Sequence, residues 1–452
     1  MTAQVFPNLI SGAVSTEVVV PAHLAETYSI GSLNLLLKNG GSISLIDVFM
    51  KIELFEDIFN PSISGYVEIK DFVGGLEKFQ LTGGEIISIS VFKPESTTPV
   101  IMRNDLVVHT INRVKFDAQN SVTYQLQFTT KSAVNSQKQR VFKSYGQQRN
   151  IGAIVQDLYN ALEAPYAINY QTPSIGLSKA FVVPGYTPIQ AINYLAKRSG
   201  ADTDYFLFFE RVNCGYRGGN FTHVFAGINK LRGLSPASNQ STYNDSIHNI
   251  VYHPSIGYTT EQGAETYVKA KSLEFQNNYN HLINMNHGFY KSRLNSLNLK
   301  NRTYESKTFS YKEGLNDFYI NELVTDTNIF GKFNNDQFPG ERLFTAGIND
   351  PVENKSRWVE YDLHGALLMS GIRIVVDVSG STNVIGAGDI VNLSIPGSYA
   401  KTYNLGQSEV AEDNMYSGKY FVSACRHTLT PFNYTKKLEL SRGSTRQKLA
   451  TP

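Results

Sequence analysis

The residues Gly84-Glu85-Ile86-Ile87-Ser88-Ile89-Ser90-Val91 carry the pattern that governs most of this chain. A glycine and an acidic residue form a turn, and apolar side chains at Ile87, Ile89 and Val91 then alternate with serines. Alternation with a period of two is typical of a β-strand that buries one face and leaves the other polar. The stretch Val122-Thr123-Tyr124-Gln125-Leu126-Gln127-Phe128-Thr129 repeats it with four apolar and four polar residues. Residues 31–135 are therefore expected to form an antiparallel barrel or sandwich.

The same pattern returns three hundred residues later. Gly388-Asp389-Ile390-Val391-Asn392-Leu393-Ser394-Ile395 matches the first stretch position by position. Two further pairs of strands follow in the same order: 107–111 with 420–424, and 124–128 with 436–440. We infer two copies of one small β domain, with Gly84 and Gly388 at equivalent turns. Ile87 is then expected to overlay Val391, and Ile89 to overlay Leu393, as inward-facing core residues.

Two helices interrupt the strands. The apolar residues Ile151, Ile154, Val155, Leu158 and Leu162 recur on one helical stripe. A second helix is predicted from Thr187 as N-cap, with Pro188 in the first turn, Gln190 completing a capping box and Gly200 at the end. Further on, residues 255–360 are rich in Asn and Tyr, and we expect a helix near 263–274.

Composition excludes several function classes. The 452 residues carry a formal net charge of +2, with 18% charged and 12% aromatic residues, so no basic face recruits nucleic acid. The C-terminal tail with Arg442, Arg446 and Lys448 is expected to be solvated. Cys214 and Cys425 match no metal or redox spacing, which favours reduced thiols. No secretion signal and no apolar run long enough to span a membrane are recognised.

No residues stand out as a catalytic, cofactor-binding or metal site. No nucleophile elbow, phosphate-binding loop or zinc-protease motif occurs. The closest histidine pairs, His248 with His253 and His281 with His287, lack zinc spacing. Two acidic pairs have the residue types that a glycosidase needs: Asp47 with Glu53, and Glu56 with Asp57. Acids on alternating strands are normally a solvated face, so we expect no enzyme, no cofactor and no metal.

The expected fold is mainly β with α+β insertions: two similar antiparallel β-barrel domains, a small helical module and an inserted domain. The expected boundaries are an extended N-terminal arm (1–30), a first barrel (31–135), an α/β helical module (136–204), a split second barrel (205–254 and 361–442), an inserted domain (255–360) and a flexible C-terminal tail (443–452).

The chain resembles a known family, the baseplate hub subunit of T-even-like contractile-tailed phages, which is related to the N-terminal part of the type VI secretion spike protein. The resemblance rests on the order of three stretches. They are 44–48 with 65–69 and 83–85; Val183-Pro184-Gly185-Tyr186-Thr187-Pro188-Ile189-Gln190 with 206–210; and 387–391 with 417–420, His427 and 434–442.

The resemblance implies a structural protein of the virion tail baseplate, assembled in the host cytoplasm without membrane insertion. It implies a homotrimeric ring of tail-tube-like barrels that adapts the six-fold tail tube protein to the three-fold central spike protein. Baseplate wedge and tape-measure proteins are further expected partners, and DNA passes through the central channel without specific binding. Two alternatives stay open: the hub of a phage-derived protein-injection particle, and a cell-wall-degrading glycosidase.

Polar strand faces are candidates for the channel wall, which should carry few cations so that DNA does not adhere. Thr123, Gln125, Gln127 and Thr129 share one face, and Lys437, Glu439 and Ser441 share the corresponding face of the second copy. The alternative is that these faces are outer surface or subunit contacts.

Overall fold

A computed structural model gives the structure of the protein. It describes residues 18–20, 27–93, 99–117, 121–146, 149–170, 180–197, 206–212, 221–227, 248–252, 259–261, 267–277, 280–288, 290–298, 302–310, 334, 336–345, 371–380, 385–396, 413 and 415–442. The fold is mainly β, as predicted. Among the described residues, no helix has the length and apolar character needed to cross a membrane.

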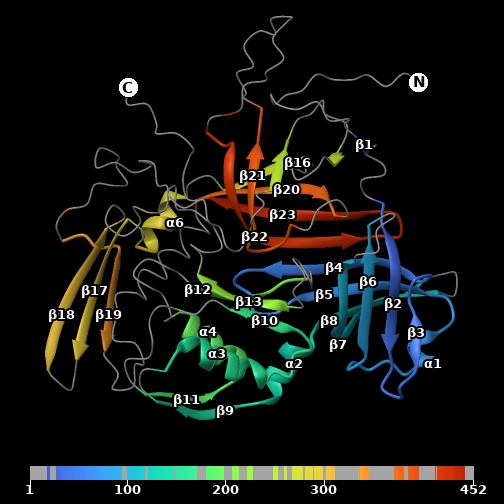
Figure 1. Cartoon of the computed structure of the whole chain (residues 1–452), viewed down its shortest axis with the longest axis horizontal. Coiled ribbons are helices and arrows are strands. Elements are labelled where there is room, and N and C mark those ends of the chain that lie inside the picture. Colours follow the sequence, from blue (N-terminus) through green and yellow to red (C-terminus); the bar gives the residue numbers. More distant parts are fainter. Residues whose placement is uncertain are drawn as a thin grey trace, which may run out of the picture.

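One sheet of thirteen strands runs through two β units (Figure 1). The first β unit has the strand order β4-β5-β8-β7-β6-β2-β3. Its elements are β2 (Ser29–Leu36), β3 (Ser42–Ser44), β4 (Phe49–Asp57), β5 (Ser64–Asp71), α1 (Gly75–Lys78), β6 (Ile86–Phe92), β7 (Pro99–Asp117) and β8 (Ser121–Thr130). The described strands of this unit do not close into a ring, whereas the sequence predicts a barrel here.

The second β unit closes into a six-stranded barrel. Its strands are β14 (His248–Val251), β16 (Tyr267–Asn277), β20 (Ile372–Ser379), β21 (Ile390–Ser394), β22 (Gly418–Leu429) and β23 (Tyr434–Arg442). The order is β21-β14-β16-β20-β23-β22, and the pairing of β21 with β22 closes the ring. The barrel is not purely antiparallel, because β14 runs parallel to both β16 and β21.

The expected equivalence of Gly84 and Gly388 is confirmed by the backbone. Both have a left-handed φ, +94° and +88°, a conformation that glycine adopts without steric cost. The N–H of Gly84 donates to the Val108 carbonyl at 2.6 Å, and the N–H of Gly388 donates to the Val422 carbonyl at 2.9 Å. In return Val108 and Val422 each donate to the acidic residue of the turn, so the two turns share one hydrogen-bonding pattern.

The strands after these turns have matching registers. Ile87 lies opposite Leu106, and Val391 lies opposite Tyr420 at the corresponding position. All four side chains are buried. Ile89 and Leu393, two residues further along each strand, are buried as well, which the alternation predicts.

Irregularities in the strands are also shared. After Val108 in β7 and after Val422 in β22, the register against the next strand shifts by one residue. A similar shift follows Phe49 in β4 and Ala270 in β16. Each such shift marks a β-bulge, which bends the strand at a defined position. The two units therefore share the strand order β4-β5-β8-β7-β6 and β16-β20-β23-β22-β21, the glycine–acid turn and these two bulges.

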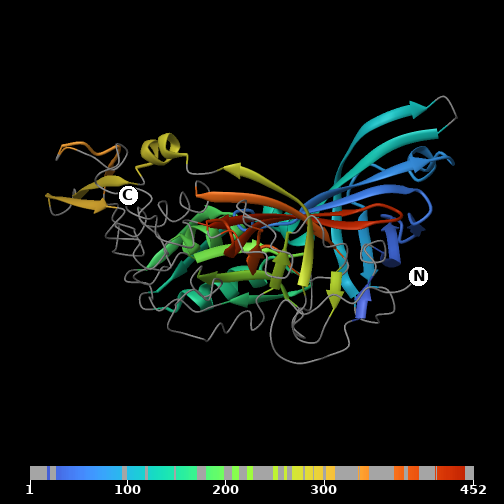
Figure 2. The same ribbon diagram turned by 90° about the horizontal axis from the view of Figure 1, so that it is seen from above.

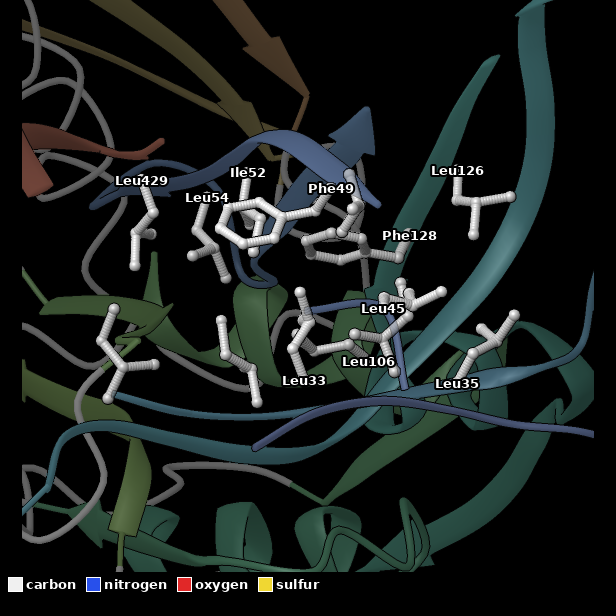
Figure 3. Packing of buried hydrophobic residues seen from close by; sticks show 14 of the residues in the cluster. Leu33, Leu35, Leu45, Phe49, Ile52, Leu54, Leu106, Leu126, Phe128 and Leu429 are labelled. Carbon is white, nitrogen blue, oxygen red and sulfur yellow. The ribbon is translucent and has the colours of Figure 1, made fainter. Parts of the chain in front are cut away.

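The two β units are joined edge to edge by β22 and β4. Ala424–Leu429 pairs antiparallel with Asp57–Ile52, so the sheet continues from one unit to the other. Leu429 lies within the core of the first unit, close to Leu54 and Ile52 (Figure 3). Burying a leucine side chain contributes about 1.5–3 kcal/mol, so the junction is apolar as well as hydrogen-bonded.

An α/β module packs beneath the sheet (Figure 1). Its elements are α2 (Lys131–Lys138), β9 (Val141–Tyr145), α3 (Ile151–Asn160), β10 (Ala167–Tyr170), β11 (Phe181–Tyr186), α4 (Pro188–Ala196), β12 (Phe206–Glu210) and β13 (Phe221–Gly227). The predicted start of α4 is confirmed, because Thr187 and Gln190 form a complete capping box. The apolar faces of α3 and α4 share one buried core with Phe206, Phe208 and Phe225.

Three predictions about this half of the chain are wrong. β12 and β13 were expected in the second barrel, but they form a separate sheet with β10. Residues 267–277 form the barrel strand β16 and not a helix near 263–274 or part of an inserted domain. Its bulge after Ala270 breaks the simple alternation, which hides the strand period from the sequence. Arg442 belongs to β23 and donates to the carbonyls of Ser417 and Met415, whereas a solvated tail was expected.

Smaller elements lie outside the main sheet. α6 (His281–Asn286) precedes a three-stranded sheet of β17 (Lys291–Asn298), β18 (Thr303–Ser310) and β19 (Gly340–Thr345). Figures 1 and 2 place this sheet at the opposite end of the molecule from the first β unit. β1 (Val18–Val20) pairs with β15 (Thr259–Glu261).

Candidate functional site

The segment Phe206–Val212 lies where the first β unit, the second β unit and the α/β module meet. All five residues of β12 are buried, and Glu210, Arg211 and Val212 continue into this buried junction. A continuous apolar run such as Phe206-Leu207-Phe208-Phe209 is typical of a strand covered on both faces. The charged pair that follows it is therefore placed inside the protein.

Glu210 binds the first β unit through Arg103 of β7. Nη2 of Arg103 donates to Glu210 Oε1 at 2.6 Å, and the same guanidinium makes two 2.8 Å hydrogen bonds to Asp105. The second oxygen of Glu210 accepts from the Thr130 hydroxyl at 2.9 Å. Burial alone would raise the pKa of Glu210, but His223 and Arg103 hold it below its ordinary value, so the carboxylate stays ionised.

His223 of β13 connects Glu210 to the α/β module. Its Nε2 lies 3.5 Å from Glu210, and its Nδ1 lies 3.0 Å from the hydroxyl of Tyr159 on α3. Burial lowers the pKa of His223, and this outweighs the attraction of Glu210 for the protonated ring.

Arg211 binds the second β unit. Its guanidinium donates two parallel hydrogen bonds of 2.7 Å to the carboxylate of Asp389, the acidic residue of the repeated turn. Asp389 also accepts from the backbone N–H of Gly386 at 2.9 Å. Bidentate pairing of this kind fixes direction as well as distance. Two adjacent residues at the end of β12 therefore bind both β units: Glu210 binds the first and Arg211 binds the second.

Glu56 completes the junction from β4. One carboxylate oxygen accepts from the N–H of Val212 at 2.5 Å, and the other accepts from the N–H of Ala387 at 2.7 Å. Nε2 of His427 lies 3.3 Å away. Burial opposes ionisation, but the hydrogen bond and charge of His427, the charge of Arg211 and the Ala387 N–H lower the pKa of Glu56 to about 2.

His427, Cys425 and Glu56 come close enough together to suggest metal ligands, since their donor atoms lie within 4.8 Å of one another. The charge and the hydrogen-bond acceptors of this group are already matched by protein groups, without an ion. Glu56 accepts from two N–H groups, and Lys436, whose pKa burial lowers to about 8, donates to the Ile385 carbonyl beside it. Burial also raises the pKa of Cys425 well above its ordinary value, which disfavours the thiolate that a metal requires.

We call Glu56, Arg103, Glu210, Arg211, Asp389 and His427 the junction clamp. Each of its residues is at most 9% exposed, so the set cannot reach a substrate. Removing one partner of a buried ion pair costs about 3–5 kcal/mol because the other charge is left uncompensated. The arrangement therefore fixes the relative position of the two β units, and it offers no accessible acid, base or nucleophile.

The acidic pairs considered from the sequence are not brought together as a catalytic site. Glu53 is buried and ion-paired with Lys51 at 2.5 Å, whereas Asp47 is exposed. Glu56 and Asp57 are neighbours on one strand and therefore point to opposite faces. Burial raises the pKa of Asp57, while that of Glu56 is lowered.

The histidine and cysteine candidates separate as well. His281 lies 2.5 Å from the Tyr290 hydroxyl, and His287 ends α6. His253 and Cys214 lie outside the described residues. Sequence reasoning missed Glu210 and Arg211, although an acid and a base directly after four apolar residues were a usable signal.

The polar face of β8 is partly covered within the chain. Gln125 is only 3% exposed, and the Thr129 hydroxyl donates to the Ile63 carbonyl at 2.9 Å. On β23, Lys437 pairs with Asp377 at 3.5 Å, and Glu439 pairs with Arg373. Both faces are therefore nearly charge-balanced, which suits either a channel wall or a contact surface.

Comparison with known proteins finds likeness in structure alone. No family model matches the sequence, and no curated protein matches it. The fold is similar to the 43 kDa tail protein of prophage MuSo2 from Shewanella oneidensis, with a TM-score of 0.53 and 10% identity over 92% of this chain and 99% of that one. A tail protein from Neisseria meningitidis MC58 gives 0.50 and 10% over 92% and 96%. The chain therefore has a fold found in tail proteins.

Proposed function

We propose that this chain is a structural subunit of a contractile phage-tail baseplate. Three copies would form a hub ring that adapts the six-fold tail tube to the three-fold central spike and leaves a channel for DNA. The protein would act by holding shape and not by catalysis. The tail-protein fold and the burial of the whole junction clamp support this role.

The observation that carries the proposal is the edge-to-edge joining of two matching β units through β22 and β4. A trimer of such chains presents six similar units around one axis while keeping true three-fold symmetry. One face can then repeat the same contact six times with a tube, and another can match a trimeric spike. A chain with a single β unit could not reconcile the two symmetries in this way.

The junction clamp supports a mechanical role. A ring of alternating units keeps its shape only if the angle between the two units of each chain is fixed. Arg211 and Asp389 are 178 residues apart in sequence, and Glu56 and Ala387 are 331 apart, yet each pair forms a buried hydrogen-bonded contact. These contacts restrain the joint more than a flexible linker would.

The proposed partners are the tail tube protein, the central spike protein and two further copies of this chain, with wedge and tape-measure proteins as additional contacts. The proposed location is the virion tail baseplate after assembly in the host cytoplasm. The competing glycosidase function finds no support in the two acidic pairs named from the sequence, because Glu53 is ion-paired with Lys51 while Asp47 is exposed, and Glu56 and Asp57 face opposite ways.

Mass measurement in solution tests the proposal. The purified chain is expected to form trimers, alone or when tube and spike proteins are added, and electron microscopy of the trimer is expected to show a ring with six similar lobes. A monomer or dimer that persists with both partners present would overturn the hub role. Clearing of peptidoglycan by the purified chain would favour the glycosidase.

A further inference from the structure

Two strand edges of the main sheet have no partner strand among the described residues. β7 pairs with β6 only as far as Val107, which leaves its edge over 109–117 open. β16 pairs with β14 only over Tyr267–Lys269, which leaves its edge over 270–277 open. Figure 2 shows β7 and β8 projecting beyond the rest of the first unit. Open backbone edges of this length are sites where another strand can add.

These two open strands are the counterparts of the two strands that join the units within the chain. β7 matches β22, since Val108 and Val422 hold equivalent positions and a bulge follows each. β16 matches β4, since Glu274 and Glu53 follow equivalent bulges at the same distance. Because β22 pairs with β4 inside the chain, the repeat supplies a template for pairing β7 with β16.

The template also fixes the register. Within the chain, Thr428 lies opposite Glu53 and Leu429 lies opposite Ile52. Lys115 corresponds to Thr428, because Lys115 lies opposite Thr123 in β8 and Thr428 lies opposite the equivalent Thr435 in β23. Phe116 corresponds to Leu429 in the same way, through Val122 and Tyr434. Glu274 and Leu273 take the places of Glu53 and Ile52.

The exposure of the paired positions agrees with a missing partner. Leu429 is fully buried in the core of the first unit, whereas its counterpart Phe116 is 84% exposed. Glu53 is buried, whereas its counterpart Glu274 is exposed. An exposed phenylalanine at the position of a core leucine is expected when the surface that covers it belongs to another molecule.

We propose that β7 of one copy pairs antiparallel with β16 of a second copy, with Lys115 opposite Glu274 and Phe116 opposite Leu273. This inference rests on the proposed ring, since each chain would offer β7 to one neighbour and β16 to the other. The second copy is the occupant because the template joins counterparts of these two strands. Lys115 and Glu274 also form an attractive cross-strand pair.

The open edge of β7 has features that hinder pairing with an unrelated strand. Two residues, Arg113 and Val114, lie between the paired positions Asn112 and Lys115, and Arg113 has a left-handed φ of +52°. A bulge and exposed cations on an edge strand hinder pairing with an arbitrary β-strand. The proposed partner compensates for them with Glu274 and with the exposed ring of Phe275.

Cysteine cross-linking tests the register. Residues directly opposite in an antiparallel pair have Cα atoms about 4.5–5.5 Å apart, which a disulfide can bridge. In a background with Cys214→Ser, the double variant Lys115→Cys/Glu274→Cys is expected to give a covalent trimer under mild oxidation. Lys115→Cys/Lys271→Cys is the matched control, because it moves one thiol three residues along β16. A mixture of the two single variants is expected to give covalent dimers only.

Phe116→Ala provides an independent measurement. It is expected to leave the unfolding midpoint of the monomer unchanged, because the side chain is exposed, while reducing the trimer population at least ten-fold. Lys115→Glu should weaken the trimer in the same way, and Lys115→Glu/Glu274→Lys should restore it. Trimers that form normally but give no Lys115–Glu274 cross-link would overturn the register and leave the hub role standing. A wild-type chain that never associates would overturn both.

Discussion

The ionisation of Glu56 gives the junction clamp a measurable pH dependence. The side chain is fully buried, and its pKa is lowered from 4.5 to about 2 by His427, Arg211 and the Ala387 N–H. A group whose pKa is lower in the folded state stabilises the fold above its unfolded pKa. That stability is lost as pH falls towards the folded value. A shift of about 2.5 units corresponds to about 3 kcal/mol at 1.36 kcal/mol per unit.

Replacing the carboxylate tests this directly. Glu56→Gln keeps the size of the side chain but removes the charge, and its amide NH₂ group faces a backbone N–H of Val212 or Ala387 that needs an acceptor. At pH 7 the variant is therefore expected to unfold about 3 kcal/mol more easily than the wild type. Between pH 5 and 3 the difference is expected to shrink, because the wild type loses its contribution and the variant has none to lose.

Urea unfolding followed by far-ultraviolet circular dichroism at pH 7, 5, 4 and 3 measures the difference. Glu77→Gln, at an exposed carboxylate of α1, is the matched control and should change stability by less than about 0.5 kcal/mol at every pH. A wild-type-minus-Glu56→Gln difference that stays constant from pH 7 to 3 would refute the assigned ionisation. A difference below about 1 kcal/mol at pH 7 would refute the importance of the clamp.

Three further outcomes are expected. Arg211→Ala leaves Asp389 buried without its cation and should cost about 3–5 kcal/mol in urea unfolding; a loss below about 1 kcal/mol contradicts this. Burial lowers the pKa of Lys436 from 10.5 to about 8, so between these pH values the unfolded chain holds a proton that the folded chain has released. The free energy of unfolding of the wild type, relative to that of Lys436→Met, should therefore rise from pH 8 to 10.5; a difference between the two proteins that stays constant over this range would speak against a buried ammonium. If the polar face of β8 lines the channel, particles with Gln127→Lys should eject DNA more slowly at low salt than particles with Gln127→Glu, and equal rates would assign that face to another surface.

Local patterns predicted the elements whose evidence lies within a few residues. The alternation at 84–91 and 122–129 identified β6 and β8, and Thr187 with Gln190 identified the start of α4. The repeated glycine–acid turn identified the two matching β units. Alternation, capping and left-handed turns are set by neighbouring side chains and backbone sterics, so the sequence states them directly.

Other assignments failed where the environment overrode the pattern. The bulge in β16 shifts the phase of its alternation, and the apolar run in β12 suits any strand covered on both faces. Which sheet such a strand joins depends on what covers it, and periodicity carries no information about that.

The sequence by itself therefore determined a mainly β protein with two related units, a capped helical module and no recognisable catalytic motif. Only the tertiary structure decided that β22 joins β4, that Glu210 and Arg211 hold both units, and that Phe116 is exposed where its counterpart Leu429 is buried. The pairs that clamp residues form with one another join positions more than a hundred residues apart. Whether a charge is paired or solvated depends on distances that exist only after the chain has folded.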